Sequence, residues 1–298
     1  MLPIDKPMGL TSHDVVAAVR RATGEGRVGH AGTLDPSATG VLVILIGSAT
    51  RLTPLLTAAQ KTYQARITFG TATDTDDADG TVTHTAAVPQ TLTDPEVART
   101  HIASIMGPHE QVPPAYSAIK RGGVVAHRAA RSGSPIELRP RTIEILDSRL
   151  NAVQTGGELS WDVTLTVSKG TYIRALARDI GTSLGTVAHL SALRRLSSGA
   201  ITLADAFPLS EVVDAPARVP GHFTDPVSAL GVPLRVVTPD EVPRINVGST
   251  VGLGDLADVP PGTAISMAEE HRLWAVYRVS PAGDILVPDV VLAGGVAR

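Results

Sequence analysis

The chain of 298 residues contains no cysteine and few aromatic residues. The lack of cysteine excludes a disulfide framework, a thiolate nucleophile and a cysteine-ligated metal. Aromatic residues make up 3% of the chain and include four tyrosines, so each tyrosine can be considered individually. No apolar run approaches the roughly 20 residues that span a bilayer, and the N-terminal residues lack the basic and apolar regions of a secretion signal. We therefore expect a cytoplasmic protein that does not contact a membrane.

The charge of the chain is low overall but unevenly distributed. The net charge is −3, which weakly disfavours a nucleic-acid-binding protein. However, residues 1–204 carry 20 basic and 17 acidic side chains, whereas residues 205–298 carry 6 and 12. Basic residues also outnumber acidic ones by seven to three over 116–149 and by five to one over 169–195. Binding to a polyanion depends on such local basic surfaces rather than on the total, although a solvated face is the alternative for any single cluster.

Hydrophobic periodicity predicts helices and strands in an irregular order. A helix is expected over 10–24, where Thr11 or Ser12 can cap the start and Gly24 can end it. The apolar run 40–47 and the alternating run 62–70 predict strands. Further along, the pattern predicts a helix starting near Asp94, a hairpin formed by 141–153 and 158–168, and a helix over 171–185. The lack of a regular strand–helix–strand rhythm favours the α+β class.

The composition changes near Ala206. Proline becomes frequent from there on, and short β-like runs dominate the last part of the chain. This pattern predicts a linker over 206–232 and a small β domain over 233–298, after a main domain over 1–205.

The segment Gly-His-Ala-Gly-Thr-Leu-Asp-Pro at 29–36 is the most informative part of the sequence. A lone aspartate before proline is usually a turn residue. Here Asp35 lies in a short loop with glycines on both sides, directly before the predicted buried strand 40–47. A strand in the core can hold such a loop rigidly, as a functional carboxylate requires.

Two further motifs follow this one, at 61–80 (KTYQARITFGTATDTDDADG) and at 168–181 (SKGTYIRALARDIG). Together with 4–12 (IDKPMGLTS) and 112–120 (VPPAYSAIK), they resemble the TruB family of tRNA pseudouridine synthases. The resemblance implies a pseudouridine synthase fold, with a mixed, mainly antiparallel sheet flanked by helices. It also implies an RNA-contacting insertion at about 74–145 and, at the C-terminus, a small PUA-like β-barrel.

The resemblance further implies isomerisation of uridine to pseudouridine at position 55 in the T-loop of tRNA. Uracil leaves C1′ of its ribose and returns through C5, so neither a redox cofactor nor a metal is needed. The family role of nucleophile carries over to Asp35. A carboxylate can attack C1′, add to the uracil ring, or take a sugar proton on a glycal route, and the sequence leaves these routes open. The target base is stacked in folded tRNA, so it must be flipped out.

Family positions suggest partners for Asp35. An ionised carboxylate in a nearly closed pocket needs a nearby cation, and the family places Arg174 in that role. Tyr63 matches a tyrosine that stacks on the target base and can take part in proton transfer, and Tyr172 can pack beside the same pocket. For single residues outside these motifs, a surface arginine or a core tyrosine would be the ordinary interpretation.

Other residues receive weaker assignments. His30 is placed against the flipped nucleotide, although a structural histidine is the commoner case, and Leu193 matches an apolar pocket residue. Lys6 either buttresses the active-site loop or contacts phosphate. The further candidates for phosphate contacts are Lys120, Arg128, Arg131, Arg194 and Arg195.

Three other patterns do not carry a function. The glycines of 24–29 match a dinucleotide fingerprint, but they follow a predicted helix instead of a strand. The acidic run 74–80 resembles a calcium loop, but Ala86 occupies the place of the required last glutamate. The nine histidines show no metal-binding spacing, so we expect no metal site.

The match departs from the family at two places. His127 stands where the family usually has a tyrosine, which weakens an aromatic role there. The C-terminal part is acidic, which disfavours contact between the PUA-like domain and RNA.

Three rival functions are weighed against the synthase. They are a synthase for another RNA or one that needs a guide RNA, a non-catalytic RNA-binding or RNA-folding protein, and a nucleotide-dependent oxidoreductase. The compact length and the lack of a long basic tail favour an enzyme that acts without a guide RNA. We also expect the enzyme to be a monomer.

Overall fold

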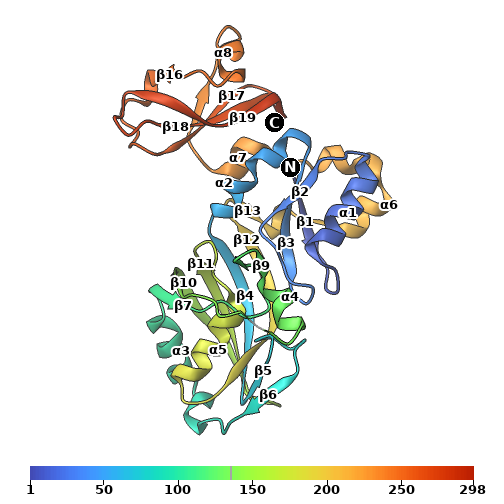
Figure 1. Ribbon diagram of the computed structural model, residues 1–298, viewed down its shortest axis with the longest axis vertical. Coiled ribbons are helices and arrows are strands. Elements are labelled where there is room, and N and C mark those ends of the chain that lie inside the picture. Colours follow the sequence, from blue (N-terminus) through green and yellow to red (C-terminus); the bar gives the residue numbers. More distant parts are fainter. Residues whose placement is uncertain (135) are drawn as a thin grey trace. The chain divides into compact units, whose positions relative to one another are not determined.

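The computed structural model describes residues 1–134 and 136–298, so Pro135, inside the expected insertion, lies outside the described residues. The described residues form two compact units. Unit 1 contains Met1–Ala59 and Ser197–Arg298, and unit 2 contains Gln60–Leu196. Figure 1 shows the elements of both units coloured along the chain.

The N-terminal elements of unit 1 include the two strands that the Asp35 loop connects. They are β1 (Leu2–Lys6), α1 (Ser12–Thr23), β2 (Val28–Ala31), β3 (Thr39–Ile46) and α2 (Thr53–Ala58). Strand β3 pairs antiparallel with both β1 and β2, and β1 also pairs in parallel with the short β14 (Phe207–Pro208). The predicted helix 10–24 is confirmed, because Thr11 caps α1 through its side chain and Gly24 ends it in the left-handed conformation.

The later elements of unit 1 include a second sheet. Its strand order is β15-β17-β18-β19-β16, and all pairs are antiparallel except β15–β17. The C-terminal part of the chain is therefore built mainly of strands, and the predicted domain bounds stay a prediction. The remaining elements of unit 1 are β13 (Ile201–Thr202), α6 (Leu209–Asp214), α7 (Pro226–Leu230), β15 (Leu234–Val236), α8 (Val242–Asn246), β16 (Val251–Gly252), β17 (Ala264–Glu269), β18 (Arg272–Val279) and β19 (Ile285–Ala297).

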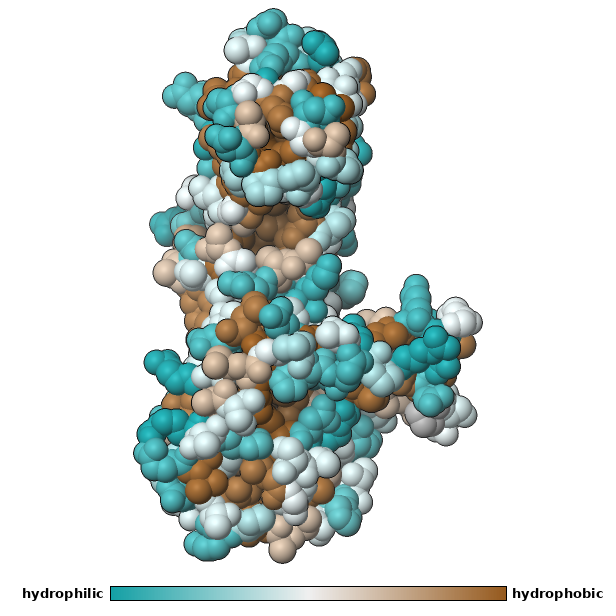
Figure 2. Space-filling model, turned by 90° about the vertical axis from the view of Figure 1, so that its left-hand side faces the viewer, coloured by the Kyte–Doolittle hydropathy of each residue, from teal (hydrophilic) through white to brown (hydrophobic). Residues whose placement is uncertain are grey.

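Two apolar clusters form the core of unit 1. One packs β3 and α2 against β17, β18 and β19, and the other fills the inner face of the C-terminal sheet around Tyr277 and Met267. Figure 2 shows hydrophilic residues interspersed with patches of hydrophobic residues on one face.

Unit 2 is built on a sheet with the strand order β12-β4-β11-β10-β7. The hairpin of β10 and β11 is antiparallel, as the sequence predicts, and so are the pairs β4–β11 and β7–β10. Strand β12 continues into unit 1, where its last residues pair with β13. The elements of unit 2 are β4 (Lys61–Phe69), β5 (Thr71–Thr73), β6 (Val82–Thr85), α3 (Pro95–Ser104), β7 (Gly107–Gln111), β8 (Lys120–Arg121), β9 (Val124–Val125), α4 (Ala126–Arg131), β10 (Arg141–Gln154), β11 (Ser160–Val167), α5 (Ile173–Ser183) and β12 (Ala188–Ser198).

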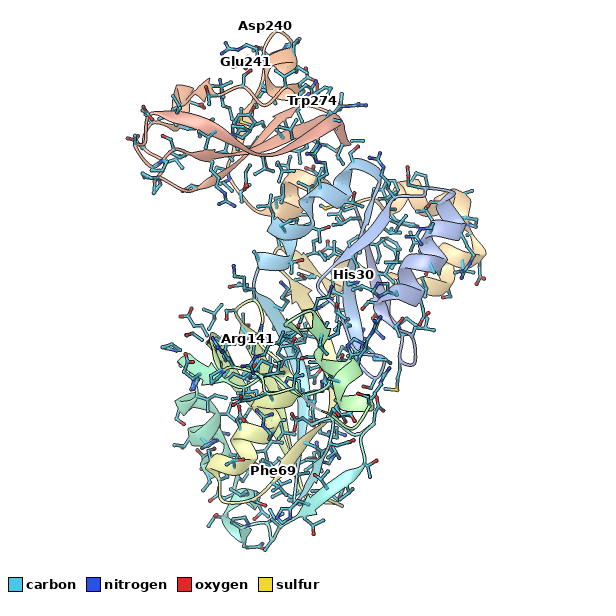
Figure 3. All side chains as sticks on the ribbon, viewed as in Figure 1. His30, Phe69, Arg141, Asp240, Glu241 and Trp274 are labelled. Carbon is cyan, nitrogen blue, oxygen red and sulfur yellow. The ribbon has the colours of Figure 1, made fainter. Side chains whose placement is uncertain are left out.

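Aromatic packing anchors the core of unit 2. Trp161 is fully buried, lies with its ring centroid 4.8 Å from that of Phe69, and donates a hydrogen bond from Nε1 to the carbonyl of Leu92. Figure 3 labels Phe69. This hydrogen bond satisfies the one polar atom of the indole, so its large apolar surface can be buried. The predicted helices beginning near Asp94 and over 171–185 are present as α3 and α5.

Candidate active site

The loop of Asp35 connects β2 to β3 and is fixed on its N-terminal side by Ser12. The hydroxyl of Ser12 donates to the carbonyl of Leu34 and accepts from its amide, both at 2.9 Å. Ser12 and Leu34 are buried, whereas Asp35 is half-buried. Two hydrogen bonds to the preceding residue limit the positions that the Asp35 backbone can adopt.

Lys6 fixes the loop on the other side. Its side chain is fully buried, and Nζ donates to the carbonyls of Pro7 at 2.9 Å, Leu10 at 2.7 Å and Pro36 at 3.3 Å. The amide of Gly9 donates to the carbonyl of Pro36 as well. These three hydrogen bonds end on backbone oxygens, and the predicted role of Lys6 at the site stays a prediction.

His30 lies on β2, opposite Ile44 of β3. Its half-buried ring makes an edge-to-face contact with His13 of α1, with 5.6 Å between the ring centroids (Figure 3). The strand pairing and the ring contact fix the position of the imidazole, and His30 precedes Asp35 by five residues in the chain. Its predicted contact with the flipped nucleotide stays a prediction.

Arg174 is buried in the first turn of α5, as the sequence predicts. Its Nη1 donates to the carbonyl of Thr75 at 2.8 Å, and its Nη2 donates to the carbonyl of Tyr116 at 2.9 Å. Nη1 also lies 3.5 Å from the carboxylate oxygen Oδ2 of Asp77. The fork of the guanidinium thereby connects two segments far apart in the chain. Its predicted pairing with Asp35 stays a prediction.

The acidic loop 74–80 is tightly built. The carboxylate of Asp77 accepts from the hydroxyl of Thr75 at 2.5 Å and from the amide of Asp79 at 3.1 Å. A Cβ atom on Gly80 would lie 2.2 Å from the Thr75 hydroxyl oxygen and 2.5 Å from a carboxylate oxygen of Asp74, so no other residue fits there without a shift. The loop is therefore an ordered element in its own right.

A second arginine of α5 holds the same loop. Arg178 pairs with Asp76 at 2.9 Å and donates to the carbonyl of Val112 at 2.8 Å. Asp76 has a left-handed backbone with φ of 61°, which aspartate tolerates better than most residues. Burial raises the pKa of its carboxyl group, and the positive charges of Arg178 and Arg174 act in the opposite direction.

Unit 2 also contains the aromatic residues that the sequence singles out. Tyr63 is 8% exposed and lies on β4 opposite Leu165. Tyr172 is half-buried and forms the N-cap position of α5, two residues before Arg174. Leu193 is half-buried on β12, and so is its neighbour Arg194. Their contacts with a nucleotide stay predictions.

A buried lysine lies at the start of β4. Lys61 is 6% exposed, and its pKa is lowered to about 8, first by burial and then by the positive charges of Arg195 and Lys169. Because burial disfavours the charged form, Lys61 loses its proton more easily than an exposed lysine does.

The candidate phosphate contacts divide into two groups. Lys120, Arg128 and Arg131 are exposed, on β8 and α4, as such contacts require. Arg195 is 1% exposed, so its assignment as a phosphate contact is wrong: the strand that carries it turns this side chain into the interior. His127, which replaces the family tyrosine, bonds back to the carbonyl of Ser117 through its amide and Nδ1.

Several residues of the site carry no clear signal in the sequence. The sequence indicates Ser12 as a possible helix cap, but its hydroxyl bonds the backbone of Leu34 in the Asp35 loop. Asp77 and Tyr116 contact Arg174 from positions 97 and 58 residues away in the chain, and no local pattern pairs such positions. Within residues 1–134 and 136–298, no group of three or more histidine, aspartate or glutamate side chains could hold a metal ion. No helix of this described part is long and apolar enough to cross a membrane.

Comparison with known proteins identifies the family. Residues 20–173 match the model of the TruB family pseudouridylate synthase (N terminal domain), and residues 174–230 match the tRNA pseudouridylate synthase B C-terminal domain. The chain belongs to the TruB family of pseudouridine synthases. It is similar to tRNA pseudouridine synthase B of Mycobacterium sp. (strain KMS), with 42% identity over 94% of this chain and 95% of that protein. The corresponding protein of Arthrobacter sp. (strain FB24) is 40% identical over 97% of this chain and 95% of its own. The enzyme is thus a tRNA pseudouridine synthase, an isomerase that acts on uridine in tRNA.

Solved structures agree with the fold of this synthase. A Cbf5-Nop10-Gar1 complex contains a chain that matches with a TM-score of 0.72 at 23% identity, covering 97% of this chain and 83% of that one. The archaeal box H/ACA sRNP Nop10-Cbf5 complex matches with a TM-score of 0.68 at 21% identity, covering 97% and 84%. At this identity the likeness concerns the fold alone. It confirms the predicted α+β pseudouridine synthase fold, and the C-terminal sheet is consistent with a PUA-like domain.

Proposed function

We propose that this synthase converts uridine 55 in the T-loop of tRNA to pseudouridine, with Asp35 as its nucleophile. The enzyme flips the target base out of the T-loop stack, cleaves its bond to C1′ and rejoins uracil through C5. It acts on tRNA without a guide RNA and as a monomer. The proposed domains are a catalytic domain over 1–205, a linker over 206–232 and a PUA-like domain over 233–298.

The observation that carries this proposal is the fixed loop of Asp35. Ser12 holds the residue before the aspartate, and Lys6 and Gly9 hold the carbonyl of the residue after it. A carboxylate that attacks or takes a proton must be placed within a fraction of an ångström, and backbone contacts on both sides of it serve that purpose. A turn residue without a function would not need a buried lysine beneath it, because burying an ammonium group is costly.

The cationic part of the site supports the same proposal. Arg174 is buried and positioned by two carbonyls and by Asp77. In the proposed reaction it is the cation that pairs with the carboxylate of Asp35. Tyr63 stacks on the flipped base, with Tyr172, Leu193 and His30 lining the nucleotide pocket. The exposed Lys120, Arg128 and Arg131, together with Arg194, contact the phosphates of the T-arm.

The test uses tRNA transcripts with tritium at C5 of their uridines. Tritium is released only when C5 becomes the glycosidic carbon. Wild-type enzyme alone, with no other RNA, metal or cofactor, is expected to release the tritium of one uridine per tRNA. A transcript with cytidine at position 55 is expected to release none, and Asp35→Asn is expected to bind tRNA but to release none.

Each alternative gives a different result. Release from the cytidine-55 transcript would place the target elsewhere in the tRNA. Release by Asp35→Asn at the wild-type rate would exclude the nucleophile. Release only after addition of a cellular RNA fraction would indicate an enzyme that needs a guide.

A further inference from the structure

The backbone of Tyr172 is held by one buried side chain. Oε1 of Gln111 accepts from the amide of Tyr172 at 2.9 Å, and Nε2 of Gln111 donates to its carbonyl at 3.1 Å. Gln111 is 2% exposed and ends β7. A side-chain amide that bonds both polar groups of one residue fixes the position and the direction of its backbone, in the way a neighbouring strand would.

The ring of Tyr172 is covered by a different side chain. The guanidinium carbon of Arg141 lies 5.0 Å from the ring centroid, within the range of a cation–π contact. Arg141 begins β10 and is the direct antiparallel partner of Gln111 on β7 (Figure 3). Side chains of directly paired residues project from the same face of a sheet, so this one pair reaches Tyr172 at its backbone and at its ring.

The surroundings of Arg141 are shaped for this contact. Gly170 has φ of +80°, and a Cβ atom there would lie 3.3 Å from Nη1 of Arg141. Within the described part of the chain, Nη2 of Arg141 is buried and makes no hydrogen bond. A buried guanidinium nitrogen without an oxygen acceptor is stabilised by the negative face of an aromatic ring, here that of Tyr172.

We propose that Gln111 and Arg141 are positioning residues that hold Tyr172 in the orientation that the isomerisation needs. This inference rests on the proposed function, in which Tyr172 lines the nucleotide pocket. Gln111 is buried and Arg141 faces the ring, so neither side chain is placed to bind a tRNA phosphate. Their loss is therefore expected to slow the reaction step and to leave the affinity for tRNA nearly unchanged.

The experiment measures single-turnover tritium release at saturating enzyme, and the Kd of tRNA by filter binding. Arg141→Met keeps the length of the side chain and removes its charge. The expected loss of rate is about 5- to 30-fold, the factor that corresponds to a desolvated cation–π contact. Arg141→Lys keeps the charge but not the planar group and is expected to recover part of the rate. Arg99→Met, on the exposed face of α3 where Arg99 pairs with Glu96, is the control and is expected to match wild type.

A double-mutant cycle separates positioning from general damage. In a Tyr172→Leu background, Arg141→Met is expected to lower the rate by less than about twofold, because its target is gone. Gln111→Met removes both backbone hydrogen bonds without adding a charge and is expected to reproduce the pattern of a slower step at unchanged Kd. Urea midpoints show that each variant is folded under the assay conditions.

Three results would overturn the inference. Arg141→Met could react as fast as wild type, or it could weaken tRNA binding by as much as it slows the reaction, which would make Arg141 a phosphate contact. Third, Arg141→Met could slow the reaction by the same factor in the Tyr172→Leu background as in wild type, which would show that the two residues act independently. If wild-type enzyme releases no tritium from uridine 55, the proposed function fails instead, and this outcome is distinct from the other three.

Discussion

Replacing Asp77 with asparagine tests how Arg174 is held. Asp77 is 8% exposed, and its Oδ2 lies 3.5 Å from Nη1 of Arg174. Asparagine has nearly the same shape and keeps an oxygen that can accept from Thr75 and from the amide of Asp79. The substitution therefore removes the negative charge and presents an amide donor toward a guanidinium that has only donors.

The expected magnitude follows from the burial of the pair. Removing one partner of a buried ion pair costs about 3–5 kcal/mol, since the other charge stays buried without compensation. Arg174 keeps its bonds to the carbonyls of Thr75 and Tyr116, so we expect about 2–3 kcal/mol here. If this loss appears in the reaction step, the rate falls by about 30- to 150-fold, at 1.4 kcal/mol per factor of ten.

The assay is single-turnover tritium release from tRNA, with the urea midpoint measured beside it. Asp162→Asn is the matched control, because Asp162 also pairs with an arginine, Arg66, at 2.7 and 3.0 Å. The side chain of Arg66 is 47% exposed, so this surface pair is expected to contribute at most about 1 kcal/mol to stability and nothing to the rate. A wild-type rate for Asp77→Asn, combined with an inactive Arg174→Met, would refute the argument that Asp77 positions Arg174.

Three further substitutions test the loop, the packing of α5 and the buried lysine. Ser12→Ala removes both hydrogen bonds to Leu34. It is expected to lower the free energy of unfolding by about 2 kcal/mol and to slow tritium release. A wild-type rate at a lower urea midpoint would show that Ser12 stabilises the fold without positioning Asp35. Gly181→Ala would place a Cβ atom 2.6 Å from the amide nitrogen of Ala188. The free energy of unfolding is expected to fall by about 3 kcal/mol, the upper end of overpacking costs, and the thermal midpoint is expected to fall with it. The pKa of Lys61 is about 8 in the folded state and 10.5 for the free side chain. Between these pH values the unfolded state binds more protons than the folded state. The free energy of unfolding therefore rises with pH, by up to about 3 kcal/mol. Urea titrations of wild type and Lys61→Met from pH 7 to 10 check this, and a difference between the two that is constant with pH would contradict it.

The sequence predicts local features of the fold well, because they depend on neighbouring residues. The capped helix α1, the strand β3 between glycines and the hairpin of β10 and β11 all follow from periodicity and turn chemistry. The motif around Asp35 also lies in one short segment. The resemblance of this motif to the family can therefore be recognised from the sequence alone.

The contacts that hold the site depend on long-range pairing and are not visible in the sequence. Ser12 reaches Leu34, and Gln111 reaches Tyr172 across 61 residues. The acidic run 74–80 lacks the last ligand of a calcium loop, and no spacing rule shows that Asp76 and Asp77 face two arginines of α5. The assignment of Arg195 as a phosphate contact is wrong for a related reason. Alternation along a strand does not say which of its two faces is buried, and the neighbours Arg194 and Leu196 are both half-buried.

The two arginines of α5 explain why this acidic loop occurs in an RNA-modifying enzyme. Arg174 and Arg178 are spaced i and i+4, so they lie on the same face of the helix. Each contacts one aspartate of the loop and one carbonyl of the segment 112–116: Arg174 contacts Asp77 and Tyr116, whereas Arg178 contacts Asp76 and Val112. A lone buried ion pair gives little net stability, but two parallel pairs restrict the loop, the segment and the helix to one arrangement. The charges of Asp76 and Asp77 are therefore directed at arginines of α5, and Asp77 orients the arginine that the proposed reaction uses.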